Sequence, residues 1–288
     1  MSLRQLRLPA PAKLNLMLRV VGRRADGYHL LQTVFQFIDL CDWITLSVRN
    51  DGHIGLARPL PGVPEESDLT VRAAKLLREE AGDASLGVAI DVEKNLPMGG
   101  GLGGGSSDAA TTLLGLNVLW SLGFSTERLA ELGLRLGADV PVFVRGYAAW
   151  GEGVGERLTP LLDLPEPWYV VVVPPCHVAT GAVFSSEGLT RDNKPITIAD
   201  FVAGQQDNHC LPLVTAMYPE VGSALASVAR HTQSAKLTGT GACVFGEFVG
   251  ETEARDAARQ LSAEWSVFVA KGINRSPILA IVAGLPAA

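Results

Sequence analysis

The chain of 288 residues lacks the features that mark several protein classes. Its four cysteines, Cys41, Cys176, Cys210 and Cys243, lie far apart without a C-x-x-C pair, which argues against a disulfide framework or a structural zinc site. Basic residues are outnumbered, and a net charge of −6 argues against a nucleic-acid or anionic-membrane surface. We therefore expect small-molecule partners and no fixed metal site in the protein.

Long hydrophobic runs are also lacking. No apolar stretch approaches the ~20 residues that span a bilayer, and the opening MSLRQLRLPAP has no signal-peptide core. With 47% hydrophobic residues, a globular cytoplasmic protein is expected. The length predicts two domains, 1–158 and 159–288, divided near the Pro-rich segment 160–167. No exposed apolar stripe distinguishes a monomer from a homodimer.

Hydrophobic periodicity and turn signals predict an α+β fold with mixed or antiparallel sheets, not a doubly wound one. A helix is expected from Ser67 or Asp68 to Gly82, and another from Ser125 to Gly137. The predicted strands cover residues 14–21, 31–40, 43–48, 87–93, 142–150, 168–173, 242–248 and 266–270, and further helices cover residues 219–231 and 251–263.

The richest local signal is LPMGGGLGGGSSDAA, residues 96–110, which stands between a predicted strand and an apolar helix. Glycine adopts positive φ freely, so successive N–H groups of such a loop can converge on an anion. Ser106 or Ser107 is predicted to cap the following helix, whose N-terminus faces the loop. The segment therefore predicts a triphosphate site built from backbone.

Three other interpretations of this loop are weaker. Gly99, Gly101 and Gly104 fit G-x-G-x-x-G, but no strand ending in an acidic residue follows about 20 residues later, as a dinucleotide fold requires. A Walker A loop needs Lys where Gly105 or Ser106 stands. A flexible linker explains the glycines but not the flanking strand and helix.

Two charged residues are candidates for catalysis. Lys13 and Asn15 project from the same face of a strand and can orient an oxyanion or hydroxyl, although a solvated strand face gives the same pattern. Asp139 follows a helix end, and Pro141 restricts Val140, so its carboxylate sits on a rigid corner. It is either a turn aspartate or, if Lys13 lies nearby, an ionised acceptor of a proton from an alcohol.

Two further segments are candidates for ligand contact. Tyr28 and His29 follow the Asp26-Gly27 turn and can stack on a base, or the tyrosine can pack over its own hairpin with the histidine in solvent. Gly239, Thr240 and Gly241 precede a strand, where the backbone can approach a ligand closely or form a plain tight turn.

Taken together, PAKLNL, RRADGYHLLQTVFQF, LPMGGGLGGGSSDAA, LGADVPVFV, KLTGTGACVFGEF and VAKGINRSP resemble the GHMP kinase superfamily, in the same order along the chain. The resemblance is specific to the branch whose acceptor is a cytidine-diphospho sugar alcohol. It implies a two-domain fold with the active site in the cleft between the domains, ATP with Mg²⁺ as phosphoryl donor, and a step of isoprenoid-precursor biosynthesis by the methylerythritol phosphate pathway.

The resemblance also assigns roles. Lys13 and Asp139 would flank the acceptor hydroxyl and Asn15 would hold the substrate; Tyr28 and Phe184 would sandwich the cytosine, with His29 at its polar edge. The ATP phosphates would be wrapped by Pro97, Met98, Gly99, Gly100, Gly101, Leu102, Gly103, Gly104, Gly105, Ser106 and Ser107. The chain departs from the family at His209, where Asp is common, and at Gly181, where Pro is common.

Other functions stay open at this stage. A superfamily member acting on homoserine or mevalonate would share the loop without needing Tyr28. A dinucleotide-dependent oxidoreductase would need a ribose-binding acid, and a non-catalytic nucleotide-binding protein would bind ATP without turnover.

Overall fold

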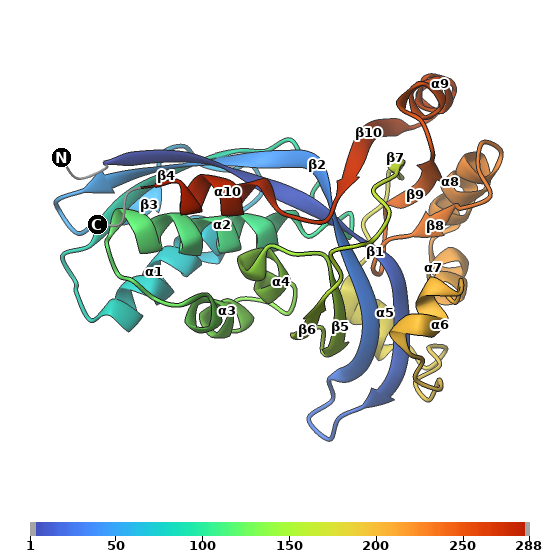
Figure 1. Ribbon diagram of the computed structural model, residues 1–288, viewed down its shortest axis with the longest axis horizontal. Coiled ribbons are helices and arrows are strands. Elements are labelled where there is room, and N and C mark those ends of the chain that lie inside the picture. The colour runs from blue at the N-terminus through green and yellow to red at the C-terminus, as the bar shows by residue number, and fades with distance from the viewer. Residues whose placement is uncertain (1–3, 286–288) are drawn as a thin grey trace.

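A computed structural model describes residues 4–285 as an elongated molecule with two lobes joined by long strands (Figure 1). The strands are β1 (Gln5–Arg23), β2 (His29–Arg49), β3 (Ile54–Leu56), β4 (Gly87–Glu93), β5 (Ala149–Gly153), β6 (Arg157–Pro160), β7 (Trp168–Val173), β8 (Lys236–Leu237), β9 (Val244–Phe248) and β10 (Ser266–Ile273). The helices are α1 (Leu69–Ala81), α2 (Gly104–Leu119), α3 (Thr126–Leu134), α4 (Val140–Arg145), α5 (Thr180–Ser185), α6 (Ile198–Val202), α7 (Leu211–Met217), α8 (Pro219–Ala229), α9 (Glu251–Leu261) and α10 (Pro277–Ala283).

The long antiparallel hairpin of β1 and β2 forms the spine of the molecule and passes from one lobe into the other (Figure 1). The two strands predicted at 31–40 and 43–48 are one strand, β2. Pro11 pairs with Cys41 and Ala12 with Ile38, so the intervening Asp39 and Leu40 form a bulge that bends the strand without ending it.

The remaining strands extend this hairpin into one sheet with the order β3-β4-β2-β10-β7-β9-β8. β1 and β5 also pair with β2, and β6 pairs with β5. Among residues 4–285, β3 and β4 pair in parallel and the other strand pairs are antiparallel. The α+β prediction with a mixed sheet is therefore confirmed.

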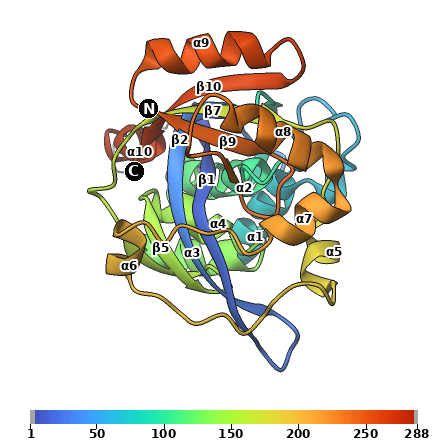
Figure 2. The same ribbon diagram turned by 90° about the vertical axis from the view of Figure 1, so that its right-hand side faces the viewer.

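Helices cover the sheet differently in the two lobes. In the first lobe α2 packs on β1 and β2, and α1 packs beside α2. In the second lobe α9 lies across β7 and β10, and α8 packs on β9 (Figure 2). Each lobe has its own apolar core, and a third cluster that includes Leu14, Ile38 and Phe245 fills the junction between them.

The predicted division after residue 158 stays a prediction. The sheet is continuous across it, because β10 pairs with β2 at Gly272 and Ile273 and with β7 at residues 266–271. The last helix, α10, also returns to the first lobe, where Ile278 is buried in the core with α2. No helix in the described part of the chain has the length and apolarity needed to cross a membrane.

Several predicted elements are confirmed by their end signals. Helix α1 follows Asp68, whose carboxylate accepts hydrogen bonds from the N–H groups of Thr70 and Val71, and it ends at Gly82, which has a φ of 67°. Helix α3 begins after Ser125, whose hydroxyl accepts from the N–H of Arg128.

The prediction of a strand from Val142 to Trp150 is wrong in its first half. Residues 140–145 form helix α4, and the strand β5 begins at Ala149. Valine favours strands because its branched side chain packs well on a sheet, but here the valines pack into the core beside α2 and α3. Pro141 lies in the first turn, where it is tolerated, and Gly146 ends the helix with a φ of 69°.

The predicted start of the central helix is also wrong. Helix α2 begins at Gly104, and its N-cap is Gly103 with a φ of 74°; among the described residues no side chain caps it. Because Gly103 turns the chain without a capping side chain, the helix starts two to three residues before Ser106 and Ser107.

Candidate active site

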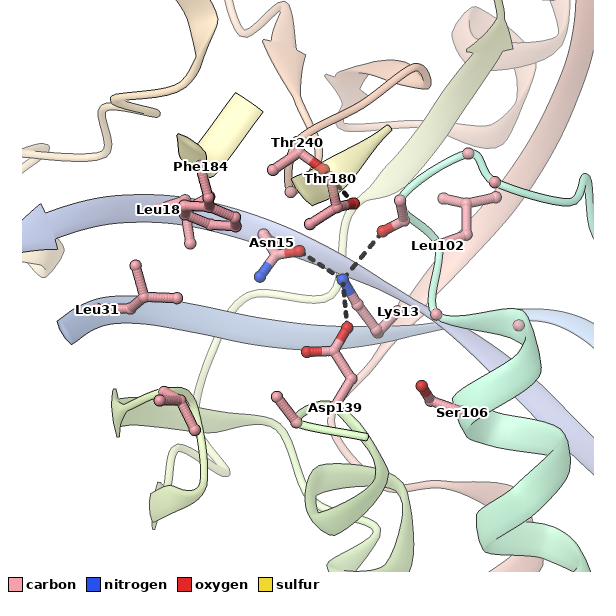
Figure 3. A pocket seen from close by; sticks show the side chains of 18 of the residues that line it. Lys13, Asn15, Leu18, Leu31, Leu102, Ser106, Asp139, Thr180, Phe184 and Thr240 are labelled. Carbon is pink, nitrogen blue, oxygen red and sulfur yellow. Dashed lines mark hydrogen bonds and ion pairs between the residues drawn. The ribbon is translucent and has the colours of Figure 1, made fainter. Parts of the chain in front are cut away.

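A cavity of about 400 Å³ lies between the two lobes and gathers most of the predicted site residues (Figure 3). Strand β1 contributes Lys13 and Asn15, the turn before α4 contributes Asp139, and the second lobe contributes residues from α5 and from the Gly239 segment. The phosphate-loop residues on its wall are Pro97, Gly99, Gly100, Gly101, Leu102, Gly103, Gly104 and Ser106.

The loop between β4 and α2 is held in shape from both lobes. The N–H of Lys13 donates to the carbonyl of Leu102 at 3.0 Å, and the N–H of Cys243 donates to the carbonyl of Gly100 at 3.1 Å. Gly101 has a φ of 78°, and a Cβ there would lie 2.6 Å from the carbonyl oxygen of Thr238. Glycine at this position is therefore required both by conformation and by space.

The N-terminus of α2 opens into the same cavity. The first intrahelical bond joins the N–H of Ser107 to the carbonyl of Gly103 at 2.8 Å, so the N–H groups of residues 104–106 precede the helical ladder. Together with the dipole of a 16-residue helix, these donors favour an anion. Ser106 lines the cavity, whereas Ser107 is buried behind it, Met98 is exposed to solvent and Gly105 lies off its wall.

Lys13 occupies the centre of the cavity. Its Nζ donates to Oδ1 of Asn15 at 2.6 Å and to the carbonyl of Gly101 at 2.9 Å, and lies 3.3 Å from Oδ2 of Asp139 (Figure 3). Lys13 and Asn15 are 3% and 4% exposed, so the interpretation as a solvated strand face is wrong. The shared face ends after Asn15, because the register shifts between Asn15 and Met17 and the strict alternation expected along β1 breaks there.

Asp139 is free to face Lys13 because it does not cap its own helix. It is the N-cap residue of α4, yet within residues 4–285 its carboxylate accepts no capping hydrogen bond from that helix. The side chain is 35% exposed, so one carboxylate holds Lys13 and remains open to the cavity. The arrangement of a half-buried carboxylate beside a buried ammonium is suited to receiving a hydroxyl group.

Asn15 ties this centre to the second lobe. Its Nδ2 donates to Oγ1 of Thr33 at 2.8 Å, and its backbone N–H donates to Oγ1 of Thr238 at 3.0 Å. With Oδ1 engaged by Lys13, the amide of Asn15 is held in one orientation.

A second cavity, of about 500 Å³, continues from the first, and both are lined by Leu31, Ala138, Val154, Thr180 and Phe184. Tyr28, His29 and Gly181 lie on its wall, and Tyr28 is 64% exposed. The rings of His29 and Phe184 stack at 5.0 Å between centroids with 28° between planes. Burial and the neighbouring charges of Arg191 and Arg23 lower the pKa of His29, which keeps the imidazole neutral near pH 7.

The Gly239 segment closes the cavity from the second lobe. Gly239 and Gly241 have φ values of 59° and 88°, and the hydroxyls of Thr240 and Thr180 are hydrogen-bonded at 2.9 Å. Asn208 supports the segment, because its Nδ2 donates to the carbonyl of Gly239 at 2.8 Å and to that of Leu237 at 2.9 Å.

The departure from the family at His209 lies away from this cavity. His209 accepts a hydrogen bond from the N–H of Val20 at Nδ1, 3.3 Å away. It lines a separate hollow with Lys236 and Leu211.

A buried ion cluster behind the loop was not predicted from the sequence. The Nζ of Lys94 pairs with carboxylates of Asp42 and Asp108, and Asp42 also accepts from the N–H groups of Asn95 and Leu96 at 2.6 and 2.8 Å. Burial, together with the Asp42 charge, raises the pKa of Asp108 to about 7 despite Lys94. Because its members are 52 and 14 residues apart, no local pattern reveals the cluster.

Within residues 4–285, no group of three or more His, Cys, Asp or Glu side chains is arranged to hold a metal ion.

The chain matches two family descriptions, "GHMP kinases N terminal domain" over residues 68–147 and "GHMP kinases C terminal" over residues 194–267. The 4-diphosphocytidyl-2-C-methyl-D-erythritol kinase of Methylococcus capsulatus is 60% identical over 273 residues, covering 95% of this chain and 93% of that protein. The protein of the same name from Pseudomonas syringae pv. syringae is 56% identical, covering 96% of this chain and 97% of its own length.

Solved structures of GHMP kinases are also similar to this chain. A crystal structure of 4-(cytidine 5'-diphospho)-2C-methyl-D-erythritol kinase has a TM-score of 0.81 and 34% identity, covering 93% of this chain and 99% of that one. Homoserine kinase from Cytophaga hutchinsonii shares the fold, with a TM-score of 0.71 and 14% identity, covering 96% of this chain and 97% of that chain. The chain therefore belongs to the GHMP kinases, and within them to the 4-diphosphocytidyl-2-C-methyl-D-erythritol kinase family.

Proposed function

We propose that the chain transfers the γ-phosphoryl group of ATP to the 2-hydroxyl of 4-diphosphocytidyl-2-C-methyl-D-erythritol, a step of the methylerythritol phosphate pathway to isoprenoid precursors. The observation that carries the proposal is the position of Lys13. Its ammonium contacts a carbonyl of the phosphate loop and the carboxylate of Asp139 inside the loop cavity, which continues into the cavity lined by Tyr28 and His29.

The triphosphate is held mainly by backbone. The loop supplies glycine N–H groups, and α2 supplies its N-terminal N–H groups and dipole. Lys13 adds one positive charge in the centre of the cavity, 3.3 Å from Oδ2 of Asp139. This arrangement explains how a chain with a net charge of −6 binds a highly charged anion.

Transfer is mostly a matter of alignment, because the transition state of phosphoryl transfer is loose and the protein performs little covalent chemistry. Asp139 accepts the proton of the acceptor hydroxyl, and Lys13 balances charge on the transferring oxygens. Asn15 holds the ammonium at Oδ1 and thereby fixes its position relative to the carboxylate.

Mg²⁺ fits the donors present. Ser106 offers a hydroxyl on the cavity wall, and Mg²⁺ prefers oxygen ligands of this kind supplemented by phosphate oxygens and water. The ion, when bound with ATP, neutralises charge on the phosphate oxygens. One side chain is too few for a preformed cage, so the metal would be held mainly by the phosphate oxygens of the nucleotide.

The nucleobase end of the substrate is assigned to the second cavity. Tyr28 and Phe184 are aromatic surfaces on its wall and His29 offers a neutral ring nitrogen, a combination suited to stacking and hydrogen bonding with cytosine.

We also propose that the enzyme works in the cytoplasm and that its partners are small molecules. Cys41, Cys176, Cys210 and Cys243 are all free thiols, as expected in a reducing compartment.

The test is ADP release by the purified chain with ATP and Mg²⁺, in the presence and absence of the cytidine-diphospho alcohol, with ³¹P NMR to locate the new phosphate ester. We expect release that depends on the cytidine substrate and a phosphate on its 2-hydroxyl. Homoserine, mevalonate and the bare sugar alcohol serve as comparison acceptors. Equal turnover of these alcohols would overturn the substrate assignment. ATP binding without turnover would overturn the kinase activity and indicate a non-catalytic nucleotide-binding protein.

A further inference from the structure

Arg191 lies behind the second cavity and connects its two walls. Its Nε donates to Nε2 of His29 at 3.0 Å, and its Nη1 donates to the carbonyl of Leu189 at 3.0 Å. Its Nη2 donates to the carbonyls of Phe184 and Ser186 at 3.0 and 2.5 Å. One guanidinium therefore makes four hydrogen bonds, two of them to His29 and Phe184, which line the second cavity.

These bonds join parts of the chain that are far apart in sequence. His29 is the first residue of β2 and Phe184 belongs to α5, and Arg191 is 162 residues from His29. The rigid fork of a guanidinium fixes the direction of each bond, so it sets the positions of the histidine ring and the Phe184 backbone together. The stacked geometry of the two rings follows from this common support.

The contact also determines where the proton of His29 lies. A guanidinium carries only donors and keeps its charge at all ordinary pH values. The ring nitrogen that faces it, Nε2, must therefore be the unprotonated acceptor, and a neutral imidazole then carries its hydrogen on Nδ1.

A second proton on His29 is opposed by its surroundings. Arg191 faces the ring from the segment after α5, and Arg23 lies opposite His29 in the antiparallel register of β1 and β2. Asp26 and Tyr28 line the same cavity. Burial and the two positive charges lower the pKa of His29, so the ring stays neutral near pH 7.

We infer that Arg191 is the positioning residue for nucleobase selection: it holds His29 in the Nδ1–H form, so that the ring offers the base a hydrogen-bond donor. The inference rests on the proposed function, because it assumes a pyrimidine in this cavity. Cytosine and uracil share the acceptor O2, so selection by a donor acts at N3, where cytosine presents an acceptor. Uracil carries a hydrogen on N3, so a donor on the enzyme would meet a donor on the base, and an unpaired buried donor is costly.

The first test determines the tautomer of His29 in the complete, ligand-free protein. Long-range ¹H–¹⁵N spectra of histidine-labelled enzyme, with His29 assigned by His29→Gln, report which ring nitrogen carries hydrogen. We expect a protonated Nδ1 and an unprotonated Nε2 that persist at pH values below the ordinary histidine pKa of ~6.5. In Arg191→Met we expect the Nε2–H form to appear and the ring to titrate near that ordinary value.

The second test measures how strongly the enzyme prefers the cytidine substrate over its uridine analogue. For Arg191→Met we expect KM for the cytidine substrate to rise roughly 10- to 100-fold, with KM for ATP changed less than about threefold, and the preference for the cytidine over the uridine analogue to fall at least about tenfold. Arg191→Lys keeps the charge but not the planar guanidinium, so its KM for the cytidine substrate and its base preference should lie between those of wild type and Arg191→Met. Arg72→Met removes an exposed arginine of α1 and should match wild type in all three measurements.

The two tests separate the inference from the proposed function. An Nε2–H tautomer in the wild type, or a tautomer and base preference unchanged in Arg191→Met, overturns the role of Arg191 while leaving the kinase activity intact. The wild-type tautomer is measured without Arg191→Met, so the inference is tested even if that variant fails to fold. Absence of turnover on the cytidine substrate by wild type would instead overturn the proposed function.

Discussion

Asp139→Asn isolates the charge of the carboxylate in the proposed reaction. The replacement keeps the shape of the side chain, and an amide oxygen can still accept a hydrogen bond from Lys13, whose Nζ lies 3.3 Å from the native carboxylate. What is lost is the ability to take a proton. We expect kcat to fall by about 10²- to 10⁴-fold, the usual contribution of a general base.

The structure also predicts the size of the other effects of Asp139→Asn. This fall corresponds to about 3–5 kcal/mol in the activation free energy, at 1.36 kcal/mol for each factor of ten. The phosphates are held by backbone N–H groups, so KM for ATP should stay within a few-fold. Because the Asp139 carboxylate is not the cap of α4, the substitution removes no capping hydrogen bond. The change in unfolding free energy then comes from the amide that replaces the carboxylate beside the buried Lys13 ammonium, a loss of about 1–3 kcal/mol.

Asp68→Ala is the matched control, because Asp68 has the opposite role. Its carboxylate caps α1 through the N–H groups of Thr70 and Val71, and its loss should cost about 0.5–2 kcal/mol of stability. It lies outside the cavity, so kcat should be unchanged. Steady-state ADP release and thermal unfolding of both variants give the comparison. Turnover by Asp139→Asn within threefold of wild type would refute the role of Asp139 in proton transfer.

Three further outcomes are expected. Lys13→Ala should lower kcat by about 10²-fold or more while changing the Kd for ATP less, as measured by titration calorimetry, and a loss confined to ATP affinity would contradict this. Tyr28→Ala should raise KM for the cytidine substrate roughly 5- to 100-fold, on the scale of base stacking, without a comparable change in KM for ATP; an unchanged KM for the cytidine substrate would exclude stacking. Burial raises the pKa of Asp108 to about 7, so the folded state binds this proton more tightly than the unfolded chain does. The contribution of Asp108 to stability is therefore present below about pH 4 and is lost as the pH rises through about 7. Urea unfolding between pH 5 and pH 8 should therefore show a smaller loss of stability with rising pH for Asp108→Asn than for wild type, and equal slopes would show that Asp108 titrates normally.

Much of the fold follows from local chemistry. Asp68 and Gly82 mark the ends of α1, and the apolar run of β7 and the strand β4 are found where the sequence predicts them. The errors arise where distant packing overrides local preference. Helix α4 is rich in valine but is fixed by its neighbours α2 and α3, and β2 passes through a bulge that the sequence marks as a break.

The site was predictable in its parts but not in its assembly. The glycine loop could be predicted because a glycine-rich turn before a helix, here with positive φ at Gly99, Gly101 and Gly103, is typical of an anion site. The pairing of Lys13 with Asp139 could be stated only as a condition, since no periodicity relates residues on a strand and at a helix start so far apart. Arg191 gave no signal at all, because its role depends on four acceptors brought to it by folding.

The two-sided support of the phosphate loop has a consequence for biosynthesis. The hydroxyl of Thr238 reaches the carbonyl of Gly101 from 137 positions further along the chain, and the N–H of Cys243 reaches that of Gly100. On the ribosome the glycine segment emerges long before these supports are made. The nucleotide cradle therefore takes its final shape among the last events of synthesis, so a truncated nascent chain carries the anion motif without the means to shape it.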